Sequence, residues 1–576
     1  MNRMRAVILA AFVLSIVALF VEQSGVETLA GLALLNLLDV GLVVLIILEI
    51  VWNIKAAPYA RLYLKRNVVS LLFVAVFVVF FVYNKVLLFW PVEAARTTGS
   101  TAIILGRNTL PLFKMYGRMR RVSGFLAGMT THPAQTIVLS FVVVILVGTL
   151  LLMLGFTSAG EEGLPFIDSL FTSTSAVCVT GLIVVDTPTT FSLWGHLTLM
   201  ALMQVGGLGI MILSFISVYI FRRSMTLEDR YLIAYAANEE DMSSLSKSVR
   251  RIIGITFGIE AAGAIVLYFG FRGEGPRAAF LALFHAVSAF CNAGFSLFTD
   301  SLEGYSDSPV VSLSVAVLIV LGGASFVVLG EAGTRLLQGI RRLGTKGPRV
   351  HRSPLTVNTQ IVLIGTGLLI LLGTIGVYAL EHGNVLRGRT LGEQYLSALF
   401  QSVTLRTAGF NTLPIGAMTT ATSVLMIAFM FVGGASGSTA GGIKINSAAV
   451  IGAAIAAGRD KSGGIVLAGR SIPVEALIRS LMVFFLGVAA VGLGTLILSV
   501  TEKAPLVDIM FESTSAFGTV GLSRGLTGNL TEFGKLVVIA LMFLGRVGPL
   551  TILAATTARR TKGLRVTYPE AEILIG

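Results

Sequence analysis

Charged residues and cysteine are both scarce in this chain of 576 residues. Asp, Glu, Lys and Arg together make up 13% of it, and there are 2 cysteines, Cys178 and Cys291, whereas 55% of the residues are hydrophobic. Two cysteines are too few for a disulfide scaffold or for a cysteine-based metal cluster. So little charge beside so much apolar surface excludes an ordinary soluble domain and predicts a protein that crosses a membrane several times.

Motifs of catalysis and of nucleotide binding are also missing. The 5 histidines are scattered and form no H-E-x-x-H pattern, and there is no Walker A, G-x-S-x-G or dinucleotide fingerprint. We therefore expect no enzymatic activity and no bound organic cofactor. The net charge of +13 comes from basic residues in short loops between apolar segments. The positive-inside rule accounts for them, so they indicate no nucleic-acid partner.

One short pattern occurs four times along the chain. SAVCVTGL, SAFCNAGF, VTLRTAGF and SAFGTVGL each contain a glycine, at positions 181, 294, 409 and 521, spaced by 113, 115 and 112 residues. A second glycine marker follows 25, 28, 24 and 24 residues later, at Gly206, Gly322, Gly433 and Gly545. Two features that keep their order through four copies predict four structural units.

Each unit has the same expected layout. A long apolar helix comes first, at residues 135–156, 251–271, 359–380 and 475–500. A segment too short to span a bilayer leads into the glycine pattern, at 164–177, 278–290, 392–404 and 505–517. A second long segment closes the unit, at about 191–220, 309–339, 419–457 and 533–556. We expect an all-α integral membrane protein in which four helix–pore helix–filter–helix units surround one central pore, because irregular backbone at membrane depth must line a hydrated path.

The repeats also set the expected domain boundaries. The pore units are predicted at residues 135–248, 249–356, 357–472 and 473–576, after an N-terminal bundle of three or four transmembrane helices at 1–134. Basic residues gather in the linkers between units and in the C-terminal tail, which places those segments in the cytoplasm. Acidic residues stand in loops near the glycine patterns and would concentrate cations at an outer mouth: Glu161, Glu162, Asp168, Asp186, Asp300, Glu303 and Asp307.

Longer motifs resemble the Trk/Ktr/HKT superfamily of potassium transporters, and the bacterial Ktr membrane subunit in particular. They are QSVTLRTAGFNT, GGASGSTAGGIK, FGTVGLSRGLTGNLT, GRVGPLT and the ending YPEAEILIG, and the match covers roughly residues 135–576. The resemblance implies potassium uptake across the cell (inner) membrane by a homodimer with one pore per protomer. It also implies a cytosolic ring of nucleotide-binding RCK-type regulatory subunits, and it leaves open sodium as an activator.

The four glycine patterns supply the candidate cation site. T-V-G opens the filter of potassium channels, where backbone carbonyls replace the water shell of the ion. The candidate filter strands are Val179-Thr180-Gly181, Asn292-Ala293-Gly294, Thr407-Ala408-Gly409 and Thr519-Val520-Gly521. In the plant branch of the superfamily, serine at the first of these glycines goes with sodium preference, so four glycines favour potassium. Because only the fourth strand reads T-V-G, we expect less regular carbonyl geometry than in a symmetric channel.

A glycine-rich stretch, GGASGSTAGG at 433–442, interrupts the second helix of the third unit. Each glycine costs a helix about 1 kcal/mol, so this stretch is not expected to be helical. The reading that fits the resemblance is an intramembrane gating loop; the alternative is a close-packed contact of small residues. The candidate gate residues in it are Gly433, Gly434, Ser436, Gly437, Ser438, Gly441 and Gly442.

Two arginines stand near the candidate pore. Arg546 replaces the second glycine of the marker, where the other units have Gly207, Gly323 and Gly434. A charge within a membrane segment is costly and usually functional. We expect Arg546 to act as an electrostatic barrier at the gate, with a helix-holding salt bridge as the alternative. Arg406 is expected to support the filter backbone with a carboxylate partner, and both cysteines are expected to be packing residues.

The first 134 residues exceed what a Ktr subunit needs. Their apolar segments, at 6–20, 29–52, 67–90 and about 98–113, loosely resemble a voltage-sensor domain. Arg107, Lys114, Arg118 and Arg121 would lie along one helical face, although Pro111 interrupts that helix. Two functional alternatives to potassium uptake therefore stay open. One is a sodium-permeable or sodium-coupled transporter, and the other is a cation channel gated by voltage through this bundle.

Overall fold

The computed structural model describes residues 133–160, 163–221, 245–344, 355–457, 465–467 and 469–557. All of them belong to the second of the two units into which the chain divides, Met1–Met129 and Thr130–Gly576. Apart from its last two residues, the predicted N-terminal bundle lies outside the described residues, as do most of the basic linkers and the tail. The described residues thus make up most of the four pore units.

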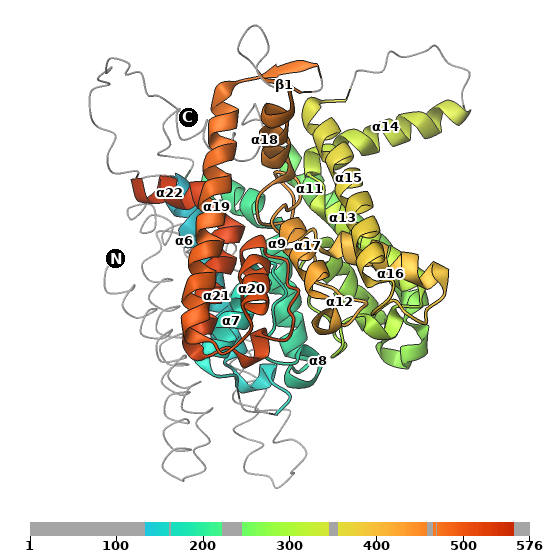
Figure 1. Cartoon of the computed structure of the whole chain (residues 1–576), viewed down its shortest axis with the longest axis vertical. Helices are drawn as coiled ribbons and strands as arrows, with labels where there is room; N and C mark the ends of the chain where they lie inside the picture. The colour runs from blue at the N-terminus through green and yellow to red at the C-terminus, as the bar shows by residue number, and fades with distance from the viewer. Residues whose placement is uncertain are drawn as a thin grey trace, which may run out of the picture. The chain divides into compact units, whose positions relative to one another are not determined.

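Every unit begins with a long helix and a shorter one packed against it (Figure 1). The long helices are α6 (Pro133–Leu152), α11 (Leu245–Gly270), α15 (Val357–Glu381) and α19 (Val474–Thr501). The short helices are α7 (Phe166–Val177), α12 (Ala278–Phe290), α16 (Leu391–Thr404) and α20 (Leu506–Gly518). At 1.5 Å per residue the short helices are roughly 20 Å long, less than the ~30 Å thickness of the hydrocarbon core. They therefore have the length and the order that the sequence analysis expects of pore helices.

The second half of each unit is less uniform than the sequence suggested. It is one helix in the first unit, α9 (Leu193–Phe221), and α17 (Thr420–Met430) with α18 (Ile445–Ala457) in the third. The second unit has α13 (Pro309–Gly323) and α14 (Phe326–Gly344), bent by 110°. The fourth has α21 (Glu532–Val547) and α22 (Pro549–Thr557), bent by 92°. The segments predicted at 309–339 and 533–556 are thus each divided by a bend that the sequence analysis did not include.

Local backbone chemistry explains both bends. Ala324, at the end of α13, adopts an extended conformation after two glycines. At the end of α21, Gly548 has a φ of 87°, which side-chain-bearing residues rarely adopt. The next residue, Pro549, has no N–H to continue the helical hydrogen bonds. The breaks in the second, third and fourth units therefore all follow the glycine marker.

Small elements fill the connections. The loop beyond the first filter strand contains α8 (Thr187–Thr190). An antiparallel hairpin, β1 (Ile465–Leu467) and β2 (Arg470–Ile472), pairs Ile465 with Ile472 ahead of α19. This hairpin departs from the all-α expectation. Threonine hydroxyls cap the starts of α15, α16, α17 and α21, and at α16 Thr390 and Glu393 form a capping box, which stabilises these helix ends by about 1 kcal/mol each.

The long helices have the length and apolarity of membrane spans. Among the described residues, Arg251–Gly270, Val357–Glu381 and Val474–Thr501 qualify as single helices, and the two bent pairs raise the number to as many as 5. Large apolar side chains on these helices are exposed, including Ile364 at 70% and Phe485 at 64%. Such surfaces suit contact with lipid, so the fold is that of a multi-pass membrane protein.

Candidate functional site: a ring of four filter strands and the layer beneath it

The four filter strands share one backbone conformation. Their first residues, Val179, Asn292, Thr407 and Thr519, have φ of 56°, 58°, 68° and 49°, and their glycines have φ of 89°, 72°, 82° and 91°. The residue between them has no positive φ in any strand. Alternating conformations of this kind turn successive carbonyls toward the same side of a strand. Positive φ outside glycine costs about 1–3 kcal/mol and collects at functional sites. The φ angles thus repeat in all four strands, although only one reads T-V-G.

The filter glycines close a ring. A Cβ placed on Gly181 would lie 2.5 Å from the carbonyl oxygen of Ala293, one on Gly294 would lie 2.8 Å from that of Ala408, and one on Gly409 would lie 2.7 Å from that of Val520. A Cβ on Gly521 would meet the carbonyl oxygen of Thr180, back in the first unit. At the filter glycines, each unit therefore meets the backbone of the next one directly. A side chain at any of these glycines would collide with a filter carbonyl.

Polar contacts in the loops beyond the filter join the same neighbours. Thr299 donates to Asp186 at 3.2 Å, linking units one and two, and Asn411 donates to Glu303 at 2.7 Å, linking units two and three. Arg524 donates to the carbonyls of Ile415 and Met418, linking units four and three. Lys535 of α21 pairs with Asp168 of α7 at 2.5 Å, which completes the circle. Three acidic residues expected at the mouth thus serve these links, while Glu161 and Glu162 lie outside the described residues.

Pore-helix serines support two of the filter glycines. The N–H of Gly181 donates to Ser175 Oγ, and that of Gly521 donates to Ser515 Oγ, both at 3.1 Å. The third unit has Val403 at this place and Arg406 nearby. Arg406 is buried, and its Nε and Nη2 have no hydrogen-bond partner. No carboxylate among the described residues pairs with it, so the expected carboxylate-paired strut was wrong.

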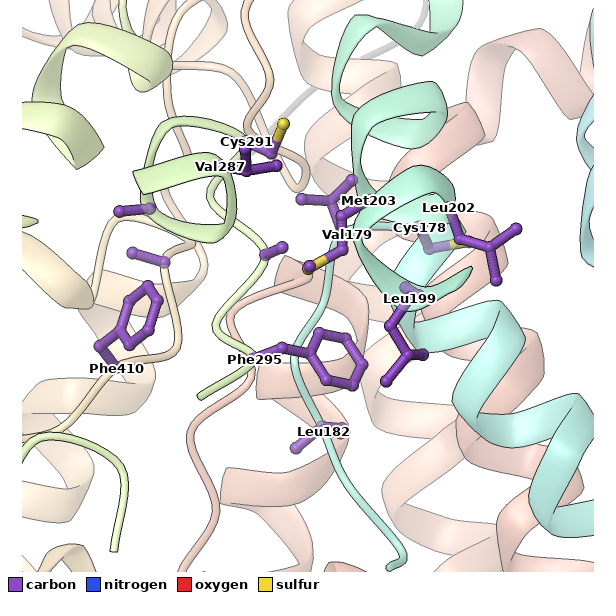
Figure 2. Close-up of a cluster of buried hydrophobic side chains, with 14 of the residues drawn as sticks. Cys178, Val179, Leu182, Leu199, Leu202, Met203, Val287, Cys291, Phe295 and Phe410 are labelled. Atoms are coloured by element: carbon purple, nitrogen blue, oxygen red, sulfur yellow. The ribbon is translucent and has the colours of Figure 1, made fainter. Parts of the chain in front are cut away.

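Filter threonines offer further oxygen atoms. The hydroxyls of Thr180, Thr407 and Thr519 are buried and have no hydrogen-bond partner. Orphan buried oxygens are rare in folded proteins, and here they stand on strands whose carbonyls form a ring. Beyond each glycine an apolar side chain anchors the strand in the protein; Figure 2 shows three of them, Leu182, Phe295 and Phe410, in the buried cluster.

The glycine marker has a structural reason. A Cβ on Gly206 would meet the carbonyl oxygen of Val177, at the end of pore helix α7. The equivalent contacts in units two and four join Gly322 to Phe290 and Gly545 to Phe517. The marker thus lets the second helix touch the carboxyl end of its pore helix, whose dipole carries partial negative charge toward a cation path. In unit three, Gly433 meets the carbonyl of Gly441 instead.

The glycine-rich stretch forms a non-helical connection between α17 and α18, so the break predicted at 433–442 is confirmed. Its backbone is held by that of unit two: Ala435 N–H donates to Gly323 O at 3.0 Å and Thr439 N–H to Gly322 O at 3.2 Å. On the filter side, a Cβ on Gly441 would meet the hydroxyl of Thr519. The loop therefore lies directly beneath a filter strand. We call this loop, together with the second helices of the other three units, the gate layer.

Arg546 is buried in this layer. Its Nη1 donates to the carbonyl of Thr439 in the loop, and its Nη2 donates to those of Gly206 and Gly207 in unit one. No described carboxylate pairs with it, so the salt-bridge alternative was wrong. Lys444 at the end of the loop donates to Ala440 O at 2.5 Å. This half-buried cation was not predicted, although its place two residues after GGASGSTAGG was the available signal.

A buried carboxylate was also missed. Glu260 of α11 is 2% exposed and accepts a hydrogen bond from Gln204 of α9 at 3.0 Å, with Cys291 Sγ 3.9 Å away. A single glutamate in an otherwise apolar span was the signal that could have identified it. Cys178 and Cys291 are both buried and free, and lie in the same apolar cluster (Figure 2), as the packing interpretation predicted.

Comparisons with known proteins agree with this architecture. The TrkH family model, described as a cation transport protein, matches residues 112–561. The Ktr system potassium uptake protein B of Vibrio alginolyticus is 38% identical, covering 77% of this chain and 94% of that protein. The protein of the same name from Bacillus subtilis is 36% identical, with coverage of 77% and 97%. Potassium/sodium uptake protein NtpJ of Enterococcus hirae is 35% identical, also with 77% and 97%. The potassium transporter TrkH of Vibrio parahaemolyticus has a similar fold, with a TM-score of 0.58 at 19% identity over 84% of this chain and 97% of that one.

Proposed function

The chain belongs to the TrkH family of cation transport proteins, and we propose that it takes up potassium through the ring of four filter strands. The closed ring of glycine contacts is the observation that carries the proposal, because a dehydrated cation needs carbonyl oxygens on every side. Relatives named for potassium uptake, at 36% and 38% identity, support potassium as the ion.

The filter would act by substituting for water. Carbonyls of the twelve strand residues, with the unpartnered hydroxyls of Thr407 and Thr519, replace the hydration shell of the ion. Four pore helices aim their carboxyl ends at the layer beneath, where their partial charges stabilise the cation. Transport is then passive and follows the electrochemical gradient.

The gate would be the loop at 433–442. It lies against Thr519 of the filter strand and hydrogen-bonds to unit two and Arg546. Backbone hydrogen bonds between a loop and its neighbours can be exchanged at low cost, so the loop can withdraw from the path. Arg546 holds the loop and adds a positive charge that opposes the cation.

The resemblance to Ktr subunits extends the proposal to the assembly. A homodimer in the inner membrane, with its linkers and C-terminus in the cytoplasm, would be regulated by a ring of nucleotide-binding RCK-type subunits. Sodium would act at most as an activator. The sodium-coupled alternative rests on one relative named for both ions, and no described residue supports voltage gating.

Growth of a bacterium that lacks potassium uptake tests the proposal. Expression of the chain should restore growth at low potassium, and co-expression of an RCK-type subunit should increase it. Purified protein in proteoliposomes should carry rubidium or potassium faster than sodium. Flux no greater than in protein-free vesicles, with folded protein present, would refute potassium transport. A sodium flux above the potassium flux would favour the sodium alternative.

A further inference from the structure

One position of the pore helix recurs behind all four filter strands. It lies nine residues before each filter glycine and is fully buried in every unit: Thr172, His285, Phe400 and Glu512. Two of these side chains, His285 and Glu512, are of a kind that is rarely buried without a hydrogen-bond or ionic partner. Neither the proposed filter nor the proposed gate uses them.

In the fourth unit, Glu512 holds the strand that leaves the filter. Its Oε2 accepts from Ser523 Oγ at 2.7 Å, and its Oε1 accepts from Thr527 Oγ1 at 2.5 Å. Ser523, two residues beyond Gly521, in turn accepts the N–H of Gly525 at 3.1 Å. A chain of hydrogen bonds therefore runs from the pore helix to the backbone just past the filter.

The second unit has the same chain with different chemistry. His285 Nε2 lies 3.0 Å from Ser296 Oγ, and Ser296 accepts the N–H of Phe298 at 3.0 Å. The other ring nitrogen, Nδ1, lies 2.8 Å from the carbonyl of Leu281, which can only accept. Nδ1 therefore carries the proton, and Nε2 of the neutral ring is the acceptor. Ser296 stands two residues past its filter glycine, as Ser523 does.

The other two units lack this anchor. The Thr172 hydroxyl has no hydrogen-bond partner, and Phe400 has no polar group to offer. The residue two past the filter glycine in unit three, Asn411, bonds to Glu303 and to Leu413 O instead. Because the glycine contacts run from unit one to two, three, four and back, the two anchored units are opposite each other in the ring.

We propose that Glu512 and His285 are a diagonal pair of positioning residues that fix the spacing of the filter carbonyls and so set ion selectivity. This inference rests on the proposed potassium filter. Strands with positive φ keep their conformation only where the surroundings over-determine it. The hydrogen bonds of Glu512 to Ser523 and of His285 to Ser296 supply that restraint at the carboxyl ends of two filter strands. Removing one of these bonds lets the carbonyls of that strand move toward a smaller ion.

Four variants test the pair. Glu512→Leu and Ser523→Ala each remove the bridge in unit four, Glu512→Gln keeps part of it, and His285→Phe copies the residue that unit three already accommodates. Thr172→Val is the matched control, since it changes the same position where no bond exists. The readouts are the potassium-to-sodium flux ratio in proteoliposomes and the thermal stability of each protein.

We expect Glu512→Leu to lower the flux ratio about tenfold, the upper scale of one ordinary hydrogen bond. Ser523→Ala should match it, the double variant should add little, and Glu512→Gln should recover part of the loss, since coupled partners are not additive. His285→Phe should also lower the ratio, and Thr172→Val should not.

Two results would overturn the inference. One is an unchanged ratio in folded Ser523→Ala and His285→Phe, even with reduced stability, which would make the bridges structural only. The other is an equal loss in Thr172→Val, which would implicate packing at this position instead of the hydrogen bond. A parent protein that carries no potassium refutes the proposed function itself, so the two failures are distinguishable.

Discussion

The filter layer and the gate layer are built from the same four repeats but differ in regularity. In the filter, all four strands share their φ angles and their glycine contacts. In the gate layer, α9 of unit one continues as one helix, whereas the second helices of units two and four bend by 110° and 92° and that of unit three is interrupted by a loop. Surrounding an ion requires equivalent oxygens from every unit, whereas opening and closing a path requires only one element that moves. The regular layer is suited to selection and the irregular one to control.

The largest effect is expected where the regular layer is broken. Gly521→Ser puts a side chain against the carbonyl of Thr180 at a φ of 91°. Strain of about 3 kcal/mol, roughly 100-fold in an equilibrium, would distort that carbonyl. The potassium-to-sodium flux ratio should fall by up to that factor, and Gly181→Ser should act in the same way. Gly528→Ser is the control, because a Cβ at Gly528 meets nothing within 4 Å. Unchanged selectivity in folded Gly521→Ser would remove this glycine from the filter.

Shortening the loop should disrupt the gate layer and leave the filter intact. Deleting Ser436–Ala440 removes the loop's hydrogen bond from Thr439 to Gly322 and the contact with Arg546. Basal flux should rise about tenfold, as lowering a barrier by about 1.4 kcal/mol would do. Its dependence on an RCK-type subunit should shrink, with the ion ratio unchanged. Ser436→Ala, which keeps the loop length, serves as the control. If flux in proteoliposomes stays at the parent level, the loop is packing and not a gate.

Substitutions at Arg546 test whether its charge or its support of the loop matters in the gate layer. Its guanidinium donates to three backbone carbonyls, whose dipoles offset part of its charge, so its barrier belongs near the lower end of roughly 1–4 kcal/mol. Arg546→Gln should raise maximal potassium flux about fivefold, the effect of about 1 kcal/mol. Arg546→Lys keeps the charge but loses the planar fork, and should stay nearer the parent. Lower flux in the Gln variant, with Lys tolerated, would make Arg546 a support for the loop alone.

The difference between the layers also explains what the sequence could predict. Spacing of the glycine patterns was enough to place the four short helices and the four strands with repeated φ angles, since every copy carries the same backbone requirement. The bends after Gly323 and Val547 escaped prediction because apolar residues follow them directly, FVVLG at 326–330 and PLTILAA at 549–555, so nothing in the composition marks the break. Arg406 was misread because a buried arginine was assumed to need a carboxylate. The anchors at His285 and Glu512 depend on serines 11 residues further along, a pairing that only the folded strand reveals.

The smallest effect should come from the polar contacts that join neighbouring units beyond the filter. These contacts occur between every pair of neighbours but use different residue types in each. Lys535 and Asp168 pair at 2.5 Å with 16% and 19% of their side chains exposed, and join the fourth unit to the first. A pair exposed to this degree contributes up to about 1 kcal/mol, so Lys535→Gln should lower the melting temperature by roughly 1–3 °C. Lys503→Gln, at an exposed lysine that has no ion pair within the described part of the chain, should not change it. The ion ratio should stay at the parent value in both, because the filter glycines contact each other without these side chains. A fall in the ratio for Lys535→Gln alone would show instead that the ring needs its outer links to hold the carbonyls in place.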